Sequence, residues 1–432
     1  MHANSAPRLS AAWFIVFGLF SQPSWAAGPD RWVPIRWEME KLELLSGTPF
    51  NCLLIPVKSS AAWDGIVVEG GQKTGQGFRV PLAPREQLSR KTKSELLAVS
   101  DSVWPGIRAL TESGAAMATP SSEPWIDSNI WLVRSARAWA GGRPIWLDHK
   151  PKKPTGNDYL RAIADAAIAG GRWIVTLDDG LRAGLDRKDP DALALWRRIC
   201  AAVKFFEDHP EWRSHPAFGR LGIIQDSTGE NLTVSGENLN LIARRQIPYR
   251  VIERTDLKEA SLGGLQAVLA TDLAPPADAE RRLLAGFVSR GGTLIAGRSW
   301  DPKAAPKEGF VTAPSGKGQV VIYSDDTPDP EALSKEMADF LGAENVGLRL
   351  FNAPSVLTYV AGDMGARLIV HLVNYSTEPA EGLLLRVRGE FRKATLYSPE
   401  SGPGALTLTP KAAMSEVSIP KFPVNVTVVL DK

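Results

Sequence analysis

"RWIVTLDDG", residues 172–180, is the stretch that decides the fold. An apolar run of strand length leads directly into two carboxylates, Asp178 and Asp179, and then a glycine. Parallel strands that are buried on both faces consist of such near-continuous apolar runs, and a (β/α)-barrel carries its chemistry where those strands end. The stretch therefore predicts an inner barrel strand whose carboxyl end opens on a cleft.

Similar apolar runs surround this stretch, and amphipathic helical segments such as "YLRAIADAAIAGG" and "DALALWRRICAAVKFFEDH" lie between or after them. The runs are "NCLLIP", "GIVVEG", "LLAVS", "AAMATP" and "RPIWLDH", with "RWVPIRWE" as a candidate further strand. Strands that alternate with helices indicate a parallel sheet. Because a TIM-type barrel needs eight strands and usually about 250 residues, we expect residues 27–216 to form such a barrel, either complete or incomplete.

Two further units follow the predicted barrel. Residues 217–343 again alternate strands and helices, and the strands are "RLGIIQD", "YRVIE", "AVLATD", "TLIAG" and "QVVIYS". Crossovers of this kind predict a doubly wound, flavodoxin-like α/β fold. Over residues 344–432 the helical pattern disappears, and short alternating strands separated by Gly, Pro and Asp predict a small antiparallel β-sandwich.

The first 26 residues have the pattern of a signal peptide. Arg8 precedes the apolar run "AAWFIVFGLF", and small residues follow at Ser24 and Ala26, so we expect cleavage near Ala26. The apolar run is shorter than the roughly 20 residues of a membrane span. The mature chain is therefore expected to be secreted or periplasmic, with no membrane contact after cleavage.

Charge and cysteine content exclude several classes of protein. The chain of 432 residues has a formal net charge of +2, from 50 basic and 48 acidic residues, so no nucleic-acid partner is expected. Only Cys52 and Cys200 are present, which excludes a disulfide scaffold. We expect two buried thiols, and a single disulfide between them is the alternative.

The order of the three units, with the segments "GGTLIAG", "GKGQVVIYSDDTPDPEALSKEMADFLG" and "VHLVNYS", resembles that of the family 42 glycoside hydrolases (β-galactosidases) and their secreted bacterial relatives. The resemblance implies a carbohydrate substrate or ligand. It also implies a middle domain like a class I glutamine amidotransferase that has lost its chemistry and serves packing or homo-oligomer formation. That family uses a glutamate after an asparagine, and no Asn-Glu pair ends a strand in the barrel segment. No catalytic residue is therefore carried over.

Glycoside hydrolysis needs two carboxyl groups, one as acid and one as base or nucleophile. The catalytic candidates at predicted strand ends are Asp148, Asp178, Asp179 and Asp127, and we expect Asp178 or Asp179 to pair with Asp148. Successive strand residues point to opposite faces, so only one of Asp178 and Asp179 can face the barrel axis. In the structural alternative, one of the two caps the helix from Leu181 onward and the other is exposed. The structural role of Asp127 would be to cap the helix "NIWLVRSARAW".

Tryptophans near strand ends are candidates for stacking on sugar rings, although a buried structural role is the commoner use of tryptophan. The substrate-binding candidates, aromatic and polar, are Glu69, Trp104, Trp125, Asn129, Trp146 and His149. Asp148 and His149 are conceivable metal ligands, but adjacent strand residues diverge and no third ligand has zinc spacing, so no metal site and no cofactor are expected.

These patterns together predict a secreted glycoside hydrolase-like protein that hydrolyses or binds a carbohydrate through carboxylates at barrel strand ends. A non-catalytic carbohydrate-binding protein derived from a glycosidase is the alternative. A third interpretation is a regulatory or assembly protein whose middle domain forms oligomers. A carboxylate pair facing across the barrel mouth would favour the enzyme over the binding protein.

Overall fold

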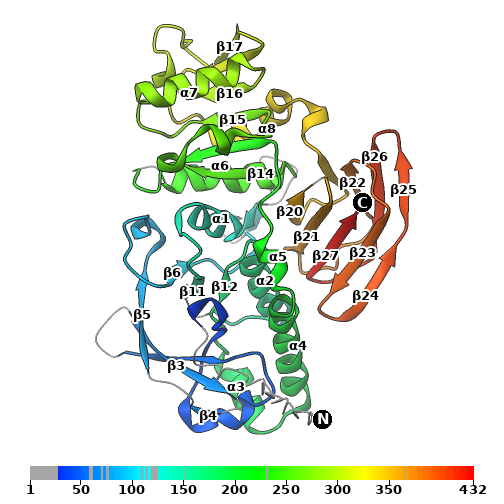
Figure 1. Cartoon of the computed structure of the whole chain (residues 1–432). Coiled ribbons are helices and arrows are strands. Elements are labelled where there is room, and N and C mark those ends of the chain that lie inside the picture. Colours follow the sequence, from blue (N-terminus) through cyan, green and yellow to red (C-terminus); the bar gives the residue numbers. More distant parts are fainter. Residues whose placement is uncertain are drawn as a thin grey trace, which may run out of the picture.

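The computed structural model describes residues 28–57, 62–69, 72–73, 77–108, 110–112, 115–117, 125–150, 152–229, 232–363 and 365–432. The predicted signal peptide lies outside these residues. A barrel, a layered α/β unit and a β-sandwich follow one another along the chain (Figure 1). Within the described ranges, no helix is both long enough and apolar enough to cross a membrane.

The barrel sheet has the strand order β1-β2-β3-β5-β6-β11-β12. These strands are β1 (Pro34–Arg36), β2 (Cys52–Pro56), β3 (Ala62–Glu69), β5 (Phe78–Ala83), β6 (Leu97–Ser102), β11 (Ile145–His149) and β12 (Arg172–Trp173). Just after β12, Val175 forms a parallel bridge with Ile35, and its carbonyl oxygen accepts a 2.9 Å hydrogen bond from the backbone N–H of Arg36. This contact joins the last strand to the first. The predicted TIM-type, barrel-like fold is confirmed.

Two details of the predicted barrel are wrong. Strand β3, which contains most of "GIVVEG", runs antiparallel to both β2 and β5. Only residues 57–61 connect β2 to β3, and a parallel connection needs a crossover of a dozen or more residues. "AAMATP" supplies no barrel strand, because β9 (Ala115–Met117) pairs with β8 (Leu110–Glu112) in a separate sheet. The strand overlooked in the sequence is β5.

Helices cover the outside of the barrel, and a separate group of side chains fills its inside. The helices are α1 (Ile130–Trp139), α2 (Gly156–Ala167), α3 (Asp179–Asp186), α4 (Pro190–Glu207) and α5 (Pro210–Ser214). Alternate strand residues, Leu53, Leu147 and Val175 among them, pack in one core with the helices. The inward-facing residues form a second cluster with Trp146 at 0% exposure. Shorter strands are β4 (Gln72–Lys73), β7 (Gly106–Ile107) and β10 (Ile126–Asp127).

The middle unit is a doubly wound sheet of order β14-β13-β15-β16-β18-β17, as predicted. All neighbours are parallel except the edge strand β17. The elements are β13 (Leu221–Gln225), α6 (Leu232–Arg244), β14 (Tyr249–Glu253), β15 (Ala267–Ala270), α7 (Asp278–Ser289), β16 (Thr293–Ala296), β17 (Phe310–Ser315), β18 (Gly318–Tyr323) and α8 (Pro330–Leu341). Helices α6 and α8 share one core, and α7 packs in the other.

The last unit consists of two antiparallel sheets that share a core, as the alternating sequence pattern predicts. The strand orders are β19-β22-β26-β25 and β20-β21-β27-β23-β24. The strands are β19 (Leu348–Phe351), β20 (Val356–Asp363), β21 (Arg367–Asn374), β22 (Leu383–Arg388), β23 (Lys393–Ser398), β24 (Ser401–Leu406), β25 (Leu408–Lys411), β26 (Met414–Ile419) and β27 (Asn425–Asp431). The domain boundaries drawn from the sequence stay a prediction.

The two cysteines are free thiols. Cys52 is buried inside the barrel, and Cys200 is half-buried on α4. The alternative of a disulfide between them is wrong for this structure.

Candidate functional site

A cleft of about 970 Å³, which we call the mouth cleft, lies at the carboxyl ends of the barrel strands. Residues from β1, β2, β3 and β11 and from the segments after β1, β6, β11 and β12 line it. The lining includes Arg36, Trp37, Glu38, Trp63, Trp104, His149, Lys152, Thr176, Asp178, Asp179 and Arg182. "RWIVTLDDG" therefore ends at an open cleft, as predicted.

The base of the mouth cleft contains an ion pair between Arg36 and Asp148. The Nη2 atom of Arg36 donates to Oδ1 of Asp148, and the two side chains are 15% and 6% exposed. The same guanidinium lies over the ring of Trp63, 4.1 Å from its centroid. Burial, and then the nearby Arg182, lower the pKa of Arg36 to about 10, so Arg36 stays charged at neutral pH. Asp148 is thus held behind Arg36 by a full opposite charge.

Asp178 is the N-cap of α3. Its Oδ1 accepts hydrogen bonds from the backbone N–H groups of Gly180 (2.8 Å) and Leu181 (3.1 Å). Its Oδ2 accepts from the hydroxyl of Tyr159 at 2.9 Å, and that hydroxyl accepts from the N–H of Asp178 at 2.8 Å. Asp179 is exposed in the first turn. The structural alternative, one aspartate capping the helix and the other exposed, is the arrangement found.

An aromatic group forms one wall of the mouth cleft. The ring of His149 stacks on Trp173 with 4.4 Å between centroids, and Trp104 meets His149 edge-on at 4.6 Å. Lys150 anchors both, because its carbonyl oxygen accepts from Nδ1 of His149 and from Nε1 of Trp104, each at 3.0 Å. Burial lowers the pKa of His149 to about 4, so the ring is neutral at neutral pH. His149 and Trp104 thus both line the mouth cleft.

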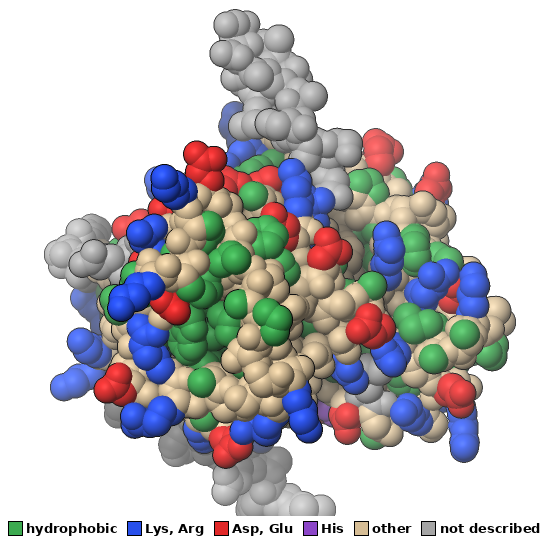
Figure 2. All heavy atoms as spheres, turned by 90° about the horizontal axis from the view of Figure 1, so that it is seen from above, with side chains coloured by type: hydrophobic (Ala, Val, Ile, Leu, Met, Phe, Trp, Pro, Cys, Tyr) green, Lys and Arg blue, Asp and Glu red, His purple; other side chains and the backbone are tan. Residues whose placement is uncertain are grey.

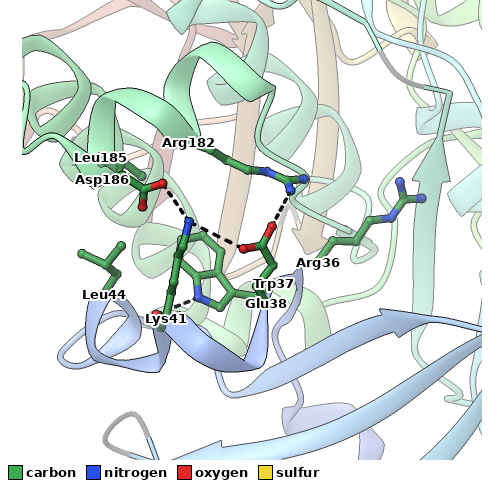
Figure 3. Close-up of a pocket in the computed structure, with 8 residues that line it drawn as sticks. All are labelled: Arg36, Trp37, Glu38, Lys41, Leu44, Arg182, Leu185 and Asp186. Carbon is green, nitrogen blue, oxygen red and sulfur yellow. Dashed lines mark hydrogen bonds and ion pairs between the residues drawn. The ribbon is translucent and has the colours of Figure 1, made fainter.

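A charged recess opens beside the mouth cleft (Figure 3). Lys41 Nζ lies 2.7 Å from Oδ2 of Asp186 and 3.6 Å from Oε2 of Glu38. Arg182 Nη1 lies 3.3 Å from the other carboxylate oxygen of Glu38. The apolar pattern of "RWVPIRWE" predicts only a candidate strand and does not identify these residues. The charged and aromatic residues at its carboxyl end, beginning with Arg36, were the signal that could have identified them.

Asp127 lies on a different ribbon, formed by β7 and β10, and Trp125 directly precedes β10. Asp127 forms an ion pair with Arg108, whose Nε lies 3.2 Å from Oδ2 of Asp127. The predicted capping role of Asp127 is wrong, because the N–H of Ile130 at the start of α1 donates to Ser128 Oγ at 3.1 Å. Neither Asp127 nor Trp125 lines the mouth cleft.

Two predicted ligand contacts are buried structural groups. Trp146 fills the barrel interior, where a side chain facing inward from a central strand has no access to solvent. Asn129 accepts a 3.0 Å hydrogen bond from the N–H of Val103 and donates to its carbonyl oxygen at 2.8 Å, so it fixes the segment after β6. The side chain of Glu69 lies outside the described residues. For the part of the chain that the structure describes, no group of three or more His, Cys, Asp or Glu could hold a metal ion.

No family model and no curated protein matches the chain. Among solved structures, the alpha-L-fucosidase isoenzyme 2 from Paenibacillus thiaminolyticus is similar, with a TM-score of 0.50 and 11% identity, covering 70% of this chain and 62% of that chain. A GH42 beta-galactosidase from G. stearothermophilus gives 0.48 at 12% identity, covering 78% and 59%. The beta-galactosidase from Bacillus circulans sp. alkalophilus gives 0.49 at 10% identity, covering 77% and 60%.

The chain spans about three fifths of the length of these enzymes, with 62% of the fucosidase covered. A match at an identity near 11% is evidence of a similar fold alone. The fucosidase match, with its TM-score of 0.50, supports such a similarity of fold. The resemblance to glycoside hydrolases expected from the sequence is confirmed at this level, and GH42 enzymes are among the structures found. The chain has a glycoside hydrolase-like fold.

Proposed function

We propose that this chain binds a carbohydrate in the mouth cleft without hydrolysing it. The proposal rests on the contacts of Asp148 and Asp178, the two strand-end carboxylates that were expected to be catalytic. Asp148 is paired with Arg36 behind the cleft surface, and Asp178 caps α3 with both oxygens engaged. A glycosidase needs one carboxylic acid and one carboxylate that both reach the scissile bond. Fixed partners already hold both of these side chains.

The lining of the mouth cleft suits sugar binding. Trp37, Trp63 and Trp104 supply aromatic surface, and an indole ring packs well against the C–H face of a sugar. Lys152 and Arg182 lie on the same lining and can donate to sugar hydroxyls. A cleft with aromatic walls and a few polar groups is the usual composition of a small-molecule site.

Hydrolysis is a second candidate, and one observation favours it. Asp148 lies next to the mouth cleft at the end of a barrel strand, and its partner Arg36 lines that cleft. Asp179, exposed on the same cleft, would be the remaining carboxyl available as the acid. This candidate requires Asp148 to become accessible when a substrate binds.

A panel of oligosaccharides tests both candidates. Isothermal titration should identify a ligand whose affinity falls at least tenfold in Trp104→Ala, a loss of roughly 1.4 kcal/mol. Trp125→Ala is the matched control, because it removes an indole that lies outside the mouth cleft. Incubation should release no sugar. Sugar release would replace binding by hydrolysis if Asp148→Asn stops it while circular dichroism shows that the variant is still folded. Failure to bind any sugar would favour the assembly protein.

We also propose that the chain is exported and forms a homo-oligomer through the middle unit. The order of charged, apolar and small residues over the first 26 positions supports export. Every residue of the edge strand β17 is exposed, including Phe310 and Val311, each at 38%. Figure 2, which views the molecule from the end that carries β17, shows hydrophobic side chains at that surface. Cell fractionation tests export. Light scattering of Val311→Lys, compared with the natural sequence, tests homo-oligomer formation.

A further inference from the structure

A second cleft, of about 960 Å³, lies at the opposite end of the barrel, where the strands begin; we call it the basal cleft. Six basic side chains line it against three acidic ones, an excess of three positive charges. The mouth cleft has four lysines and arginines on its lining against three carboxylates. The positive excess is therefore a property of the basal end, although the whole chain is nearly neutral at +2.

Three arginines and a single carboxylate form the centre of the basal cleft. Glu207, the last residue of α4, accepts from Nε and Nη2 of Arg172, both at 2.9 Å. Its Oε1 also lies 2.6 Å from Nη2 of Arg213. Arg137 joins the group from the last turn of α1, where its Nη2 donates to the carbonyl oxygen of Arg213 at 2.9 Å. One carboxylate among three guanidinium groups leaves two positive charges uncompensated.

The local backbone is built to admit Arg137. Gly170 has a φ of +92°, and a Cβ added there would lie 2.1 Å from Nη1 of Arg137. A side chain at position 170 would therefore be strained and would displace the guanidinium. The sequence "AGG" after α2 both ends that helix and makes room for the arginine.

Helix ends account for part of this charge. Cations near the carboxyl end of a helix interact favourably with its dipole and its last carbonyl groups. Arg137 on α1 fits that role, and Arg213 donates to the carbonyl oxygen of Phe206 near the end of α4 at 3.2 Å. Yet Nε of Arg213 is buried and donates to no group among the described residues. Burial and then the neighbouring Arg172 lower the pKa of Arg213, since each disfavours its charged form.

We propose that the basal cleft binds an oxyanion, a phosphate or sulfate group, between Arg137 and Arg213. Guanidinium groups match these oxygens with two parallel N–H donors, and an anion would offset the repulsion among the three arginines. The group is either a free ion or an ester on a larger molecule. The site is independent of carbohydrate binding in the mouth cleft, because it lies at the other end of the barrel.

Isothermal titration at constant ionic strength tests the site, with sodium phosphate, sodium sulfate, glucose 6-phosphate and glucose 6-sulfate as probes. The natural protein should bind at least one of them, and Arg137→Gln should weaken that binding tenfold or more. Arg290→Gln is the matched control, because Arg290 is also an exposed arginine at the carboxyl end of a helix. Arg213→Lys, which keeps the charge and loses the planar fork, should weaken binding as well.

Each outcome decides the proposal. Tighter binding of the esters assigns the site to a group on a larger molecule, and equal or tighter binding of the inorganic ions assigns it to the free ion. The proposal is overturned if no probe binds, or if Arg137→Gln and Arg290→Gln bind equally well. Far-ultraviolet circular dichroism of each variant confirms that the comparison is made between folded proteins.

Discussion

Among the residues that the structure describes, two aspartates are buried around the barrel, and they are held in opposite ways. Asp148 lies inside it and has Arg36 as a positive partner. Asp165 lies on α2 with 0% of its surface exposed, and no described cation pairs with it. A buried carboxylate needs either a charge partner or several hydrogen-bond donors, so the two sites show the two available solutions.

The hydrogen-bond network around Asp165, which consists of uncharged donors, joins the barrel to the β-sandwich. Asp165 Oδ1 accepts from the hydroxyls of Ser128 and Tyr375, both at 2.6 Å. Its Oδ2 accepts from the backbone and side-chain nitrogens of Asn129, both at 2.9 Å. Tyr375 directly follows β21, so this network crosses between two units of the chain. The ion pair at Asp148, in contrast, joins two strands of one barrel.

The largest effect is expected when one partner of the ion pair is removed. Asp148→Asn leaves the guanidinium of Arg36 without its counter-charge, and breaking a buried pair in this way costs about 3 to 5 kcal/mol. Urea unfolding followed by tryptophan fluorescence measures the loss. The double variant Arg36→Met with Asp148→Leu removes both charges and should recover most of it. A loss below about 1 kcal/mol, the range of exposed pairs, would show that the pair is solvated.

Removing a single donor from the Asp165 network should cost less unfolding free energy than breaking the ion pair. Tyr375→Phe removes one of the donors to Asp165 and leaves a buried acceptor short of a hydrogen bond, at a cost of about 1 to 3 kcal/mol. Tyr397→Phe is the control, since the hydroxyl of Tyr397 forms no hydrogen bond within the described residues. Equal losses in the two variants, measured by urea unfolding, would contradict a structural role for the network.

The comparison also predicts a difference in pH dependence. Burial raises the pKa of Asp165 above its ordinary value of 3.8. The folded chain then holds this proton more tightly than the unfolded chain, so stability contributed by Asp165 falls as pH rises from about 4 to its native pKa. The slope within that window is at most about 1.4 kcal/mol per pH unit. In Asp165→Asn this fall should be absent, and urea midpoints between pH 4 and 8 would show it.

The same slope in Asp165→Asn as in the natural sequence would assign the pH dependence to another group. Asp272 in the middle unit is the strongest alternative, because burial raises its pKa to about 6. Asp272→Asn therefore serves as the control for the measurement.

Sequence periodicity was sufficient for the fold class because each strand carries its own apolar pattern. The flavodoxin-like order of the middle unit followed from strands such as "RLGIIQD" separated by helices. The direction of β3 was missed, since an apolar run looks the same in either direction and only the short connection after Pro56 reveals it.

The candidate site was harder to predict because its contacts are distant in sequence. Arg36 and Asp148 are 112 positions apart, and only closure of the barrel brings them together. Trp146 and Asp148 share the inner face of β11, but the first fills the core and the second lies near the mouth. The position along the strand, which periodicity does not give, decides between these roles. Roles that depend on neighbouring residues were easier to predict from the sequence, as the capping alternative for Asp178 shows.

The smallest expected effects belong to the pair that ends "RWIVTLDDG". Asp178→Ala removes the N-cap of α3 and the acceptor of the Tyr159 hydroxyl, so it should cost about 1 kcal/mol. Asp179→Ala removes only an exposed charge from the first helical turn, worth about 0.3 to 0.5 kcal/mol. Both losses should be far smaller than that of Asp148→Asn, because solvent reaches these two side chains and replaces part of what is lost. If Asp179→Ala instead cost as much as Asp178→Ala in the same urea titration, the cap would not be what holds this strand end. If both abolished release of sugar from an oligosaccharide, the carboxylates would be catalytic after all.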